Sequence, residues 1–167
     1  MTSIEIIPAE ESHLPAIFSI YNDAILHGTA TFDTDTKSNE EITQWWKKHN
    51  QKYCVFVAMH GSELLGWASL SQWSDKQAYN DSAELSVYIL PSSQGQNIGQ
   101  MLMKKVLEQG KSEGVHTVIS RITQGNDISI HIHKKFGFEM VGVLKEVGRK
   151  FGRLLDVTMM QKILNEL

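Results

Sequence analysis

Residues 83–111 read AELSVYILPSSQGQNIGQMLMKKVLEQGK and contain the pattern that decides the fold. Apolar side chains occupy every second position from Leu85 to Ile89, which is the period of a strand with one buried face. Pro91 ends this strand, because proline has no N–H to continue a sheet ladder. From Ile98 to Lys111 apolar residues return at helical spacing along one side. The stretch therefore predicts a strand, a polar turn and an amphipathic helix in direct succession.

The same periodicities predict further strands and helices on both sides of this unit. The expected strands are 4–7, 53–59, 64–70, 83–90, 115–121, 138–146 and 154–163. Expected helices begin at Ser12, at a capping box formed by Ser38 and Glu41, at Ile98, and at Asn126 or Asp127. No repeat or Pro/Gly-rich linker interrupts the chain. We therefore expect residues 1–167 to form one α/β (α+β) domain around a mixed sheet.

Composition excludes several classes of function. The 167 residues are 41% apolar, and 16 basic against 19 acidic side chains give a net charge of −3. A globular domain of this size buries roughly 70% of its unfolded surface. The absence of a basic stripe argues against nucleic-acid binding. One cysteine, Cys54, excludes an internal disulfide framework and a multi-cysteine metal site. The sequence has no signal-like start and no apolar run of about 18 residues, so we expect a cytoplasmic protein without a membrane partner.

The polar turn before Ile98 is the first candidate site. A helix start presents free main-chain N–H groups and the positive end of the helix dipole, which suits a phosphate or diphosphate. The turn has neither the G-K-[ST] of a Walker phosphate loop nor the G-x-G-x-x-G of a dinucleotide fold. The residues alone also fit an ordinary strand-to-helix connector.

Two further candidates carry side-chain chemistry. Asn126, Ser129 and His133 have the spacing of one helical face, which fits either a ligand groove or a solvated surface. Glu84 lies inside a strand-forming run where glutamate is disfavoured, so it is either solvated or kept for chemistry. His131 and His133 do not share a helical face, so no metal site is expected. The sequence shows no Ser/His/Asp or Cys/His nucleophile arrangement.

Taken together, these segments resemble the GNAT superfamily of N-acetyltransferases, and within it the phosphinothricin and methionine sulfoximine acetyltransferase branch. Residues 94–99, QGQNIG, match the superfamily's cofactor signature [QR]-x-x-G-x-[GA] except at one glycine. The branch-like segments are IYNDA at 20–24 with Thr31-Phe32, ELSVY at 84–88, NDISI at 126–130 with His133 and Phe136-Gly137-Phe138, and GVLKEVGRKFGR at 142–153. The ordered agreement runs from Ile4 to the C-terminus.

The resemblance implies a fold, a cofactor and roles for residues. It implies one mixed sheet of six to seven strands with about four helices, acetyl-CoA as co-substrate and no metal. The implied cofactor-binding residues are Val87, Tyr88, Ile89, Gln94, Gly95, Gln96, Asn97, Ile98, Gly99, Asn126 and Ser129. Glu84 corresponds to the general base, and His133 to a group that protonates or hydrogen-bonds the leaving thiolate. The acetyl group passes directly from sulfur to nitrogen without a protein nucleophile.

Two departures from the branch pattern bear on ligands. Asn97 replaces the second motif glycine, and we expect cofactor binding to survive because asparagine tolerates unusual backbone angles. Ser74 and Asn80 stand where branch members carry arginines that suit a carboxylate. The resemblance implies a substrate site formed by Phe32, Trp73, Lys76, Tyr79 and Lys150.

The leading hypothesis is an N-acetyltransferase acting on the primary amine of a small amino-acid-like molecule, of the phosphinothricin or methionine sulfone type. The alternatives are another amine, such as a polyamine, a drug or a protein N-terminus, and a non-catalytic CoA-binding module. Retention of Glu84 and His133 weighs against the binding module. A homodimer formed through the C-terminal strands is expected from the resemblance.

Overall fold

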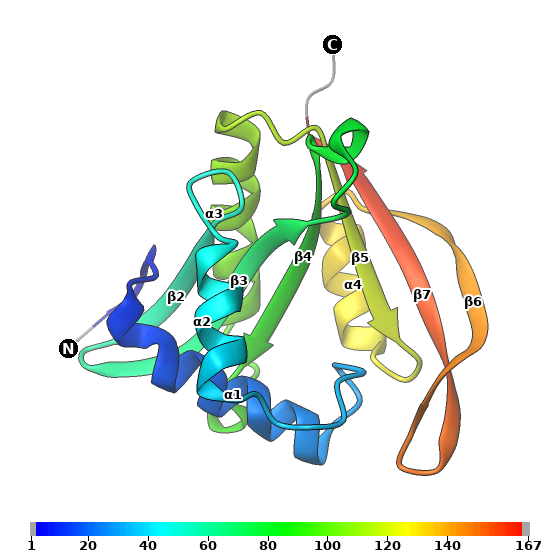
Figure 1. Cartoon of the computed structure of the whole chain (residues 1–167), viewed down its shortest axis with the longest axis horizontal. Helices are drawn as coiled ribbons and strands as arrows, with labels where there is room; N and C mark the ends of the chain where they lie inside the picture. The colour runs from blue at the N-terminus through cyan, green and yellow to red at the C-terminus, as the bar shows by residue number, and fades with distance from the viewer. Residues whose placement is uncertain (1–2, 165–167) are drawn as a thin grey trace.

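The computed structural model describes residues 3–164, and its strands form one seven-stranded sheet in the order β1-β2-β3-β4-β5-β7-β6 (Figure 1). The strands are β1 Ile4–Pro8, β2 Val55–His60, β3 Glu63–Gln72, β4 Ser82–Ile89, β5 Thr117–Thr123, β6 Glu139–Lys150 and β7 Arg153–Ile163. The pair β4–β5 is parallel and the other pairs are antiparallel. The expectation of a mixed sheet with six to seven strands is confirmed.

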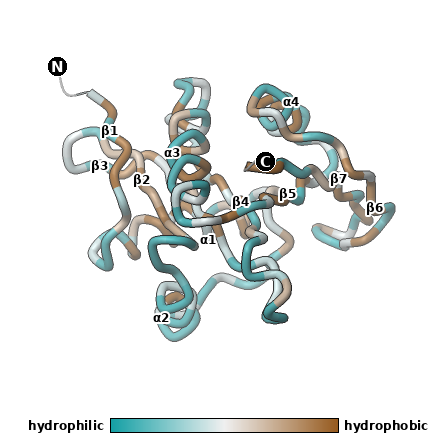
Figure 2. The backbone as a smooth tube through the Cα atoms, turned by 90° about the horizontal axis from the view of Figure 1, so that it is seen from above, coloured by the Kyte–Doolittle hydropathy of each residue, from teal (hydrophilic) through white to brown (hydrophobic). Residues whose placement is uncertain are grey.

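Helices cover both faces of the sheet (Figure 2). They are α1 Leu14–His27, α2 Asn39–Lys47, α3 Ile98–Ser112 and α4 Asp127–Lys135, with short 3-10 turns at Glu11–His13, Gln77–Tyr79 and Pro91–Ser93. One apolar cluster joins α1 and α2 to the sheet, and a second joins α3 and α4 to the opposite face. None of these helices, within residues 3–164, is long and apolar enough to cross a membrane.

The alternation predicted for β4 is confirmed by the way its side chains divide between the two clusters. Leu85, Val87 and Ile89 pack in the cluster under α3, whereas Tyr88 packs in the cluster under α1. This division follows from the two-residue period of a strand. As a result Glu84, which has the same parity as Tyr88, lies on the α1 side of the sheet.

Side-chain caps set the starts of α2 and α4. Ser38 accepts from the Glu41 N–H while its own N–H donates to the Glu41 carboxylate, which confirms the predicted capping box of α2. The Asn126 side chain accepts from the Ser129 N–H and caps α4 as predicted. Ser12 was predicted as the N-cap of α1, but a 3-10 turn spans Glu11–His13 and the N-cap is His13, one residue later.

The final hairpin is longer than the sequence predicted. β6 continues to Lys150 and returns through a two-residue turn at Phe151 and Gly152, whose φ values are 50° and 73°. Two positive φ values make a tight hairpin turn that follows the twist of the strands. The sequence predicted that this strand ends at Glu146. In the structure Glu146, at φ 50°, interrupts the regular pairing, but the strand continues beyond it. Its N–H donates to Asp156 at 2.8 Å, which holds the irregularity in place.

Candidate active site

The sheet opens between its two parallel strands. β4 pairs with β5 over Ser82–Glu84 and Thr117–Ile119, and beyond Glu84 the pairing ends. Figure 1 shows the two strands diverging from this point. The edge of β4 from Leu85 to Ile89 therefore presents main-chain groups that have no partner strand on the β5 side. Such an edge can take an extended ligand arm in place of a strand.

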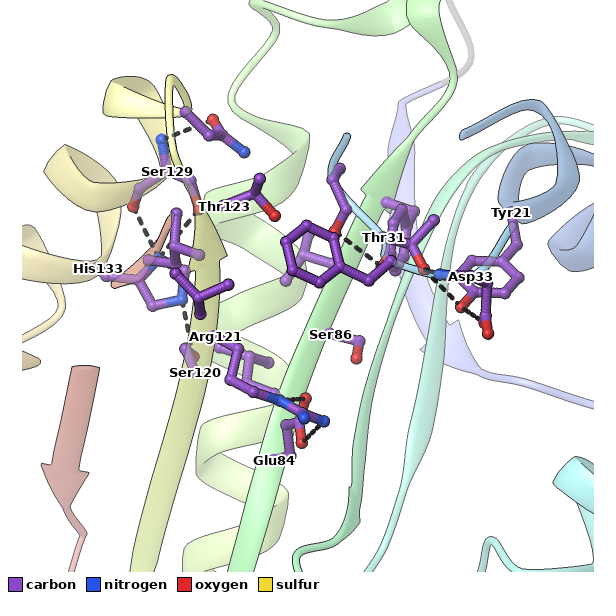
Figure 3. Close-up of a pocket in the computed structure, with 18 residues that line it drawn as sticks. Tyr21, Thr31, Asp33, Glu84, Ser86, Ser120, Arg121, Thr123, Ser129 and His133 are labelled. Atoms are coloured by element: carbon purple, nitrogen blue, oxygen red, sulfur yellow. Dashed lines mark hydrogen bonds and ion pairs between the residues drawn. The ribbon is translucent and has the colours of Figure 1, made fainter. Parts of the chain in front are cut away.

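A cavity of about 410 Å³ occupies this opening (Figure 3). Its walls come from four parts of the chain: the end of α1 with the loop that follows it, β4, β5 with α4, and β7. The lining residues are Tyr21, Ala30, Thr31, Phe32, Asp33, Glu84, Leu85, Ser86, Val87, Tyr88, Ser120, Arg121, Ile122, Thr123, Asn126, Ser129, His133 and Val157. The sequence candidates Glu84, His133, Val87, Tyr88, Asn126, Ser129 and Phe32 are thus brought together here.

Glu84 lies where the two strands part and forms a two-point ion pair with Arg121 of β5. Arg121 Nε donates to Glu84 Oε1 at 3.0 Å, and Nη2 donates to Oε2 at 2.6 Å. The Glu84 side chain keeps 20% of its surface exposed, so solvent and a ligand can still reach the carboxylate. Each carboxylate oxygen has a lone pair beyond the one that accepts from arginine, and it can accept a proton or a water hydrogen there.

His133 reaches the cavity through a neighbouring hydroxyl. Nδ1 lies 2.7 Å from the Ser129 carbonyl oxygen, which can only accept, so Nδ1 carries the proton. Nε2 then accepts from Ser120 Oγ at 2.9 Å. Burial lowers the pKa of His133, which keeps the ring neutral at neutral pH. In this arrangement the ring directs no proton into the cavity, and Ser120 donates its only hydroxyl hydrogen to the ring, so a donor role for His133 requires the other tautomer.

We expect the free energy of unfolding to fall as the pH is lowered from about 7.5 to 5.5, by up to about 1.4 kcal/mol per pH unit for each buried neutral histidine. Burial lowers the pKa of His133 and of His49 below the ordinary value of about 6.5. Below that value the unfolded chain binds more protons than the folded one, so protonation favours unfolding. Urea denaturation at several pH values measures the slope, with His131→Gln, at an exposed position, as control.

Replacing His133 by glutamine is expected to flatten part of this slope, whereas the control variant keeps the wild-type slope. A wild-type profile that stays level across this pH range would show that the buried rings do not resist protonation.

The loop after α1 forms the wall opposite β5. Tyr21 donates from its hydroxyl to Asp33 and contacts Thr31 Oγ1 at 2.9 Å. Lys150 is 4% exposed, and its ammonium group donates to the Thr31 carbonyl at 2.9 Å. Burial lowers the pKa of Lys150, and nearby Asp33 acts in the opposite direction. Lys150 therefore ties this wall to β6. It does not line the cavity, where the sequence had placed it as a substrate ligand.

Phe32 extends from this wall into the cavity because β6 leaves room for its ring. A Cβ added at Gly148 would collide with the Phe32 ring carbons, so the glycine permits the ring to lie flat against the strand. The placement of Phe32 thus depends on a residue more than a hundred positions away in the sequence.

The turn between β4 and α3 presents the helix start that the sequence predicted. The first intrahelical bond runs from the Met101 N–H to the Asn97 carbonyl at 3.1 Å. The N–H groups of Ile98, Gly99 and Gln100 precede it and are the orphan donors of the helix start. Space around this turn is open, because a Cβ built on Gly95 meets no atom within 4 Å. Residues 94–97 are exposed, so the turn fits a diphosphate approaching from solvent.

Asn97 adopts the backbone conformation that the motif glycine normally supplies. Its φ and ψ are 61° and 12°, in the left-handed region that asparagine tolerates better than most residues. Its side-chain oxygen accepts from Gln100 Nε2 at 3.3 Å, so part of the side chain is held along the first turn of α3.

We expect Asn97→Val to lower the free energy of unfolding by about 1–2 kcal/mol, since a β-branched residue is strained at this φ. Asn97→Gly should change it by less than about 1 kcal/mol, because glycine accepts the conformation but adds freedom to the unfolded chain. Urea denaturation measures both. Gln96→Val, at a neighbouring exposed position without positive φ, is the matched control and should have little effect. Equal losses at 96 and 97 would contradict the assignment to backbone strain.

Besides Lys150, three predicted substrate residues lie outside the cavity, namely Trp73, Lys76 and Tyr79. Lys76 and Tyr79 are exposed in the loop that carries the Gln77–Tyr79 turn. Trp73 precedes them and contacts the site through Arg121, whose guanidinium carbon lies 5.8 Å from the centre of the indole ring. Only Trp73 of these three is therefore linked to the catalytic opening. Ile89 and residues 94–99 also do not line the cavity. They lie at the end of β4 and in the turn that leads to α3.

Several side chains at the site escaped the sequence reasoning, and Arg121 is the most consequential of them. Arg121 could have been identified as a charged side chain within the predicted strand 115–121, the same feature that singled out Glu84. Ser120 and Asp33 have no local pattern that sets them apart from other polar residues. Their roles come from partners distant in sequence, namely His133 and Tyr21.

Comparison with known proteins places this geometry in a family. Residues 14–138 match the model of the Acetyltransferase (GNAT) family. The chain is 34% identical over 161 residues to an L-methionine sulfoximine/L-methionine sulfone acetyltransferase of Pseudomonas paraeruginosa, covering 95% of this chain and 94% of that one. It is 35% identical to a phosphinothricin N-acetyltransferase of Streptomyces coelicolor, covering 92% of each chain. The structure of yncA from Salmonella typhimurium, solved with its cofactor acetyl-CoA, superposes with a TM-score of 0.94 at 30% identity, covering 99% of this chain and 96% of that one.

The chain belongs to the acetyltransferase (GNAT) family, as its opened sheet and the helix start beyond it also indicate. Within that family it is an acetyl-CoA-dependent N-acetyltransferase of the phosphinothricin and methionine sulfoximine acetyltransferase type.

Proposed function

We propose that this enzyme transfers an acetyl group from acetyl-CoA to the primary amine of a small amino-acid-like substrate, by direct attack while both are bound. The observation that carries the proposal is the unpaired edge of β4, which joins the helix start of α3 to the cavity at Glu84. The names of the relatives supply the acceptor class: methionine sulfone, methionine sulfoximine and phosphinothricin are amino-acid-like amines.

The residues along β4 fit an extended cofactor. The main-chain N–H groups of residues 95–100 would hold the diphosphate at the start of α3. The open edge at Val87, Tyr88 and Ile89 would pair with the pantetheine arm, and the side-chain amide of Asn126 faces the same cavity. From Ile89 back to Glu84 the strand spans about 16 Å. Acetyl-CoA supplies the acetyl group as an activated thioester at the Glu84 end.

Glu84 acts as the general base in this proposal. An amine binds mainly as ammonium at neutral pH and must lose a proton before it can attack a carbonyl carbon. Glu84 is the carboxylate at the end of the open edge, and it accepts this proton directly or through one water. The ion pair with Arg121 fixes both oxygens in position for this step.

No protein nucleophile is required for a direct transfer. Cys54, the single cysteine, is 4% exposed in the cluster under α3, and burial raises the pKa of its thiol to about 12. Such a thiol is inert at neutral pH. His133 lies at the cavity wall, and with its proton on Nε2 instead of Nδ1 it would donate to the leaving thiolate directly or through the Ser120 hydroxyl.

A thiol-release assay tests the proposal with acetyl-CoA and a panel of amines: L-methionine sulfone, L-methionine sulfoximine, phosphinothricin, spermidine and a peptide with a free N-terminus. We expect turnover of at least one amino-acid-like acceptor and little or none of spermidine and the peptide. Preference for spermidine or the peptide would overturn the acceptor class. Tight acetyl-CoA binding in calorimetry with no acceptor turned over would favour a binding module.

We also propose that the chain works in the cytoplasm, where acetyl-CoA is available, as a homodimer formed through β6 and β7. β6 lies at the edge of the sheet (Figure 1), and several of its apolar side chains are exposed. These are Met140, Val141, Val143, Leu144 and Val147, and Leu154 on β7 is exposed as well. Exposed apolar side chains on an edge strand are unfavourable in a monomer, and a second copy would bury them.

Sedimentation equilibrium tests the dimer. We expect wild-type protein to have twice the monomer mass at micromolar concentration, and a Val143→Glu/Leu144→Glu variant to sediment as a monomer. The matched control is Leu26→Glu, at an exposed position on α1 and outside the β6–β7 hairpin. A monomeric wild-type protein, or equal behaviour of the two variants, would contradict an interface at β6 and β7.

A further inference from the structure

We propose that Arg121 binds the α-carboxylate of the acceptor, so that the ion pair it forms with Glu84 recognises an α-amino acid as a zwitterion. This inference deepens the proposed function and rests on it. Arg121 lies on β5 two residues beyond Ile119, the partner of Glu84 in the sheet, and its side chain lines the cavity and extends to Glu84 (Figure 3).

Arg121 has hydrogen-bonding capacity left over after it has paired with Glu84. A guanidinium group carries five N–H donors in a planar fork. Glu84 takes one from Nε and one from Nη2. Among residues 3–164, no other acceptor bonded to this guanidinium group is found, and 57% of the side-chain surface is exposed. The Nη1 edge is therefore free to take a carboxylate, for which arginine has the matching geometry.

Trp73 restricts the side from which a ligand can approach Arg121. The guanidinium carbon lies 5.8 Å from the centre of the indole ring, within the range of a cation–π contact. The guanidinium group thus contacts the indole ring at the start of the loop that follows β3, and 57% of the Arg121 side-chain surface stays exposed. This contact also orients the loop against the site without placing Lys76 or Tyr79 in it.

The spacing of charges favours an α-amino acid over other anionic amines. Glu84 must reach the amine nitrogen, directly or through one water, and Arg121 lies within 3.0 Å of Glu84. An anionic group bound by Arg121 must therefore lie close to the amine. In an α-amino acid a single carbon separates the amine from the carboxylate. Glu84 on β4 then faces the ammonium group of the zwitterion, and Arg121 on β5 faces its carboxylate.

Steady-state kinetics with two acceptors that differ in one group tests this inference. The acceptors are L-methionine sulfone and 3-(methylsulfonyl)propan-1-amine, which lacks the carboxylate. For Arg121→Gln we expect KM for the amino acid to rise about 10–100-fold, because a charge-assisted bidentate contact with its carboxylate is lost. KM for the amine, which has no carboxylate, should stay within about twofold. The change in kcat should be similar for both acceptors, because Glu84 loses the same partner in each case.

Two further variants separate recognition from positioning. Arg121→Lys keeps the positive charge but lacks the planar guanidinium fork, so its KM for the amino acid should lie between those of the wild type and Arg121→Gln. Lys47→Gln, at an exposed position on α2, is the control and should leave both KM values unchanged. Equal KM changes for both acceptors, or an unchanged KM for the amino acid, would show that Arg121 merely positions Glu84. Acetylation of the amine but not of the amino acid by the wild-type enzyme would overturn this inference alone. Failure to acetylate any amine would overturn the proposed function and this inference with it.

Discussion

Glu84→Gln is expected to lower kcat by about 10²–10⁴-fold while leaving the affinity for acetyl-CoA nearly unchanged. Glutamine has almost the same shape and can still accept a hydrogen bond from Arg121, but it cannot take a proton from the bound ammonium. The cofactor would bind along the edge of β4 beyond Glu84, so its main-chain contacts do not depend on the carboxylate. Thiol release measures kcat, and calorimetry measures the dissociation constant of acetyl-CoA.

The pH dependence separates a lost base from a disturbed site. With the base removed, the variant depends on the small fraction of amine that is already deprotonated, so its rate should climb steadily toward alkaline pH. Glu63→Gln, at an exposed position on β3, is the matched control and should keep wild-type kinetics. A pH–rate profile in Glu84→Gln that matches the wild type would remove Glu84 from the role of base.

Gly99→Val is the second substitution with a large expected effect, a loss of about 10–100-fold in acetyl-CoA affinity. Gly99 lies in the first turn of α3, where its N–H is one of the free donors of the helix start. Valine methyl groups would stand where the diphosphate has to approach these donors. Within the protein a Cβ at this position meets only Val87 Cγ1 at 3.9 Å and Ile89 Cγ1 at 4.0 Å, which are ordinary contacts.

Because the added Cβ makes only ordinary contacts within the protein, the affinity should fall without a comparable loss of stability. Calorimetry gives the affinity, and thermal denaturation of the unliganded protein gives the stability. Gly99→Ala should have a smaller effect on binding. Gly142→Val on β6, where a Cβ meets nothing within 4 Å, is a control remote from the helix start. Unchanged acetyl-CoA affinity in Gly99→Val would show that the cofactor has been placed wrongly.

The sequence predicted best those features that neighbouring residues control. The strand at 83–90, the helix from Ile98 and the capping box at Ser38 each depend on contacts within about four residues, and each appears in the structure. The left-handed conformation of Asn97 is of the same local kind. The end of β6 was predicted less well, because its pairing continues past Glu146 through a contact with Asp156 on the next strand.

By itself, the sequence determined the strand, turn and helix of residues 83–111, because the hydrophobic period and the turn depend on residues that are close together in the sequence. It also singled out Glu84 as a carboxylate in an unusual setting. The tertiary structure decided what surrounds that carboxylate. Arg121 meets Glu84 across 37 positions of sequence, and Lys150 joins Thr31 across 119. A periodic pattern states which face of a strand is buried but not which strand lies beside it. The partners of Glu84 therefore follow from the point at which β4 and β5 separate.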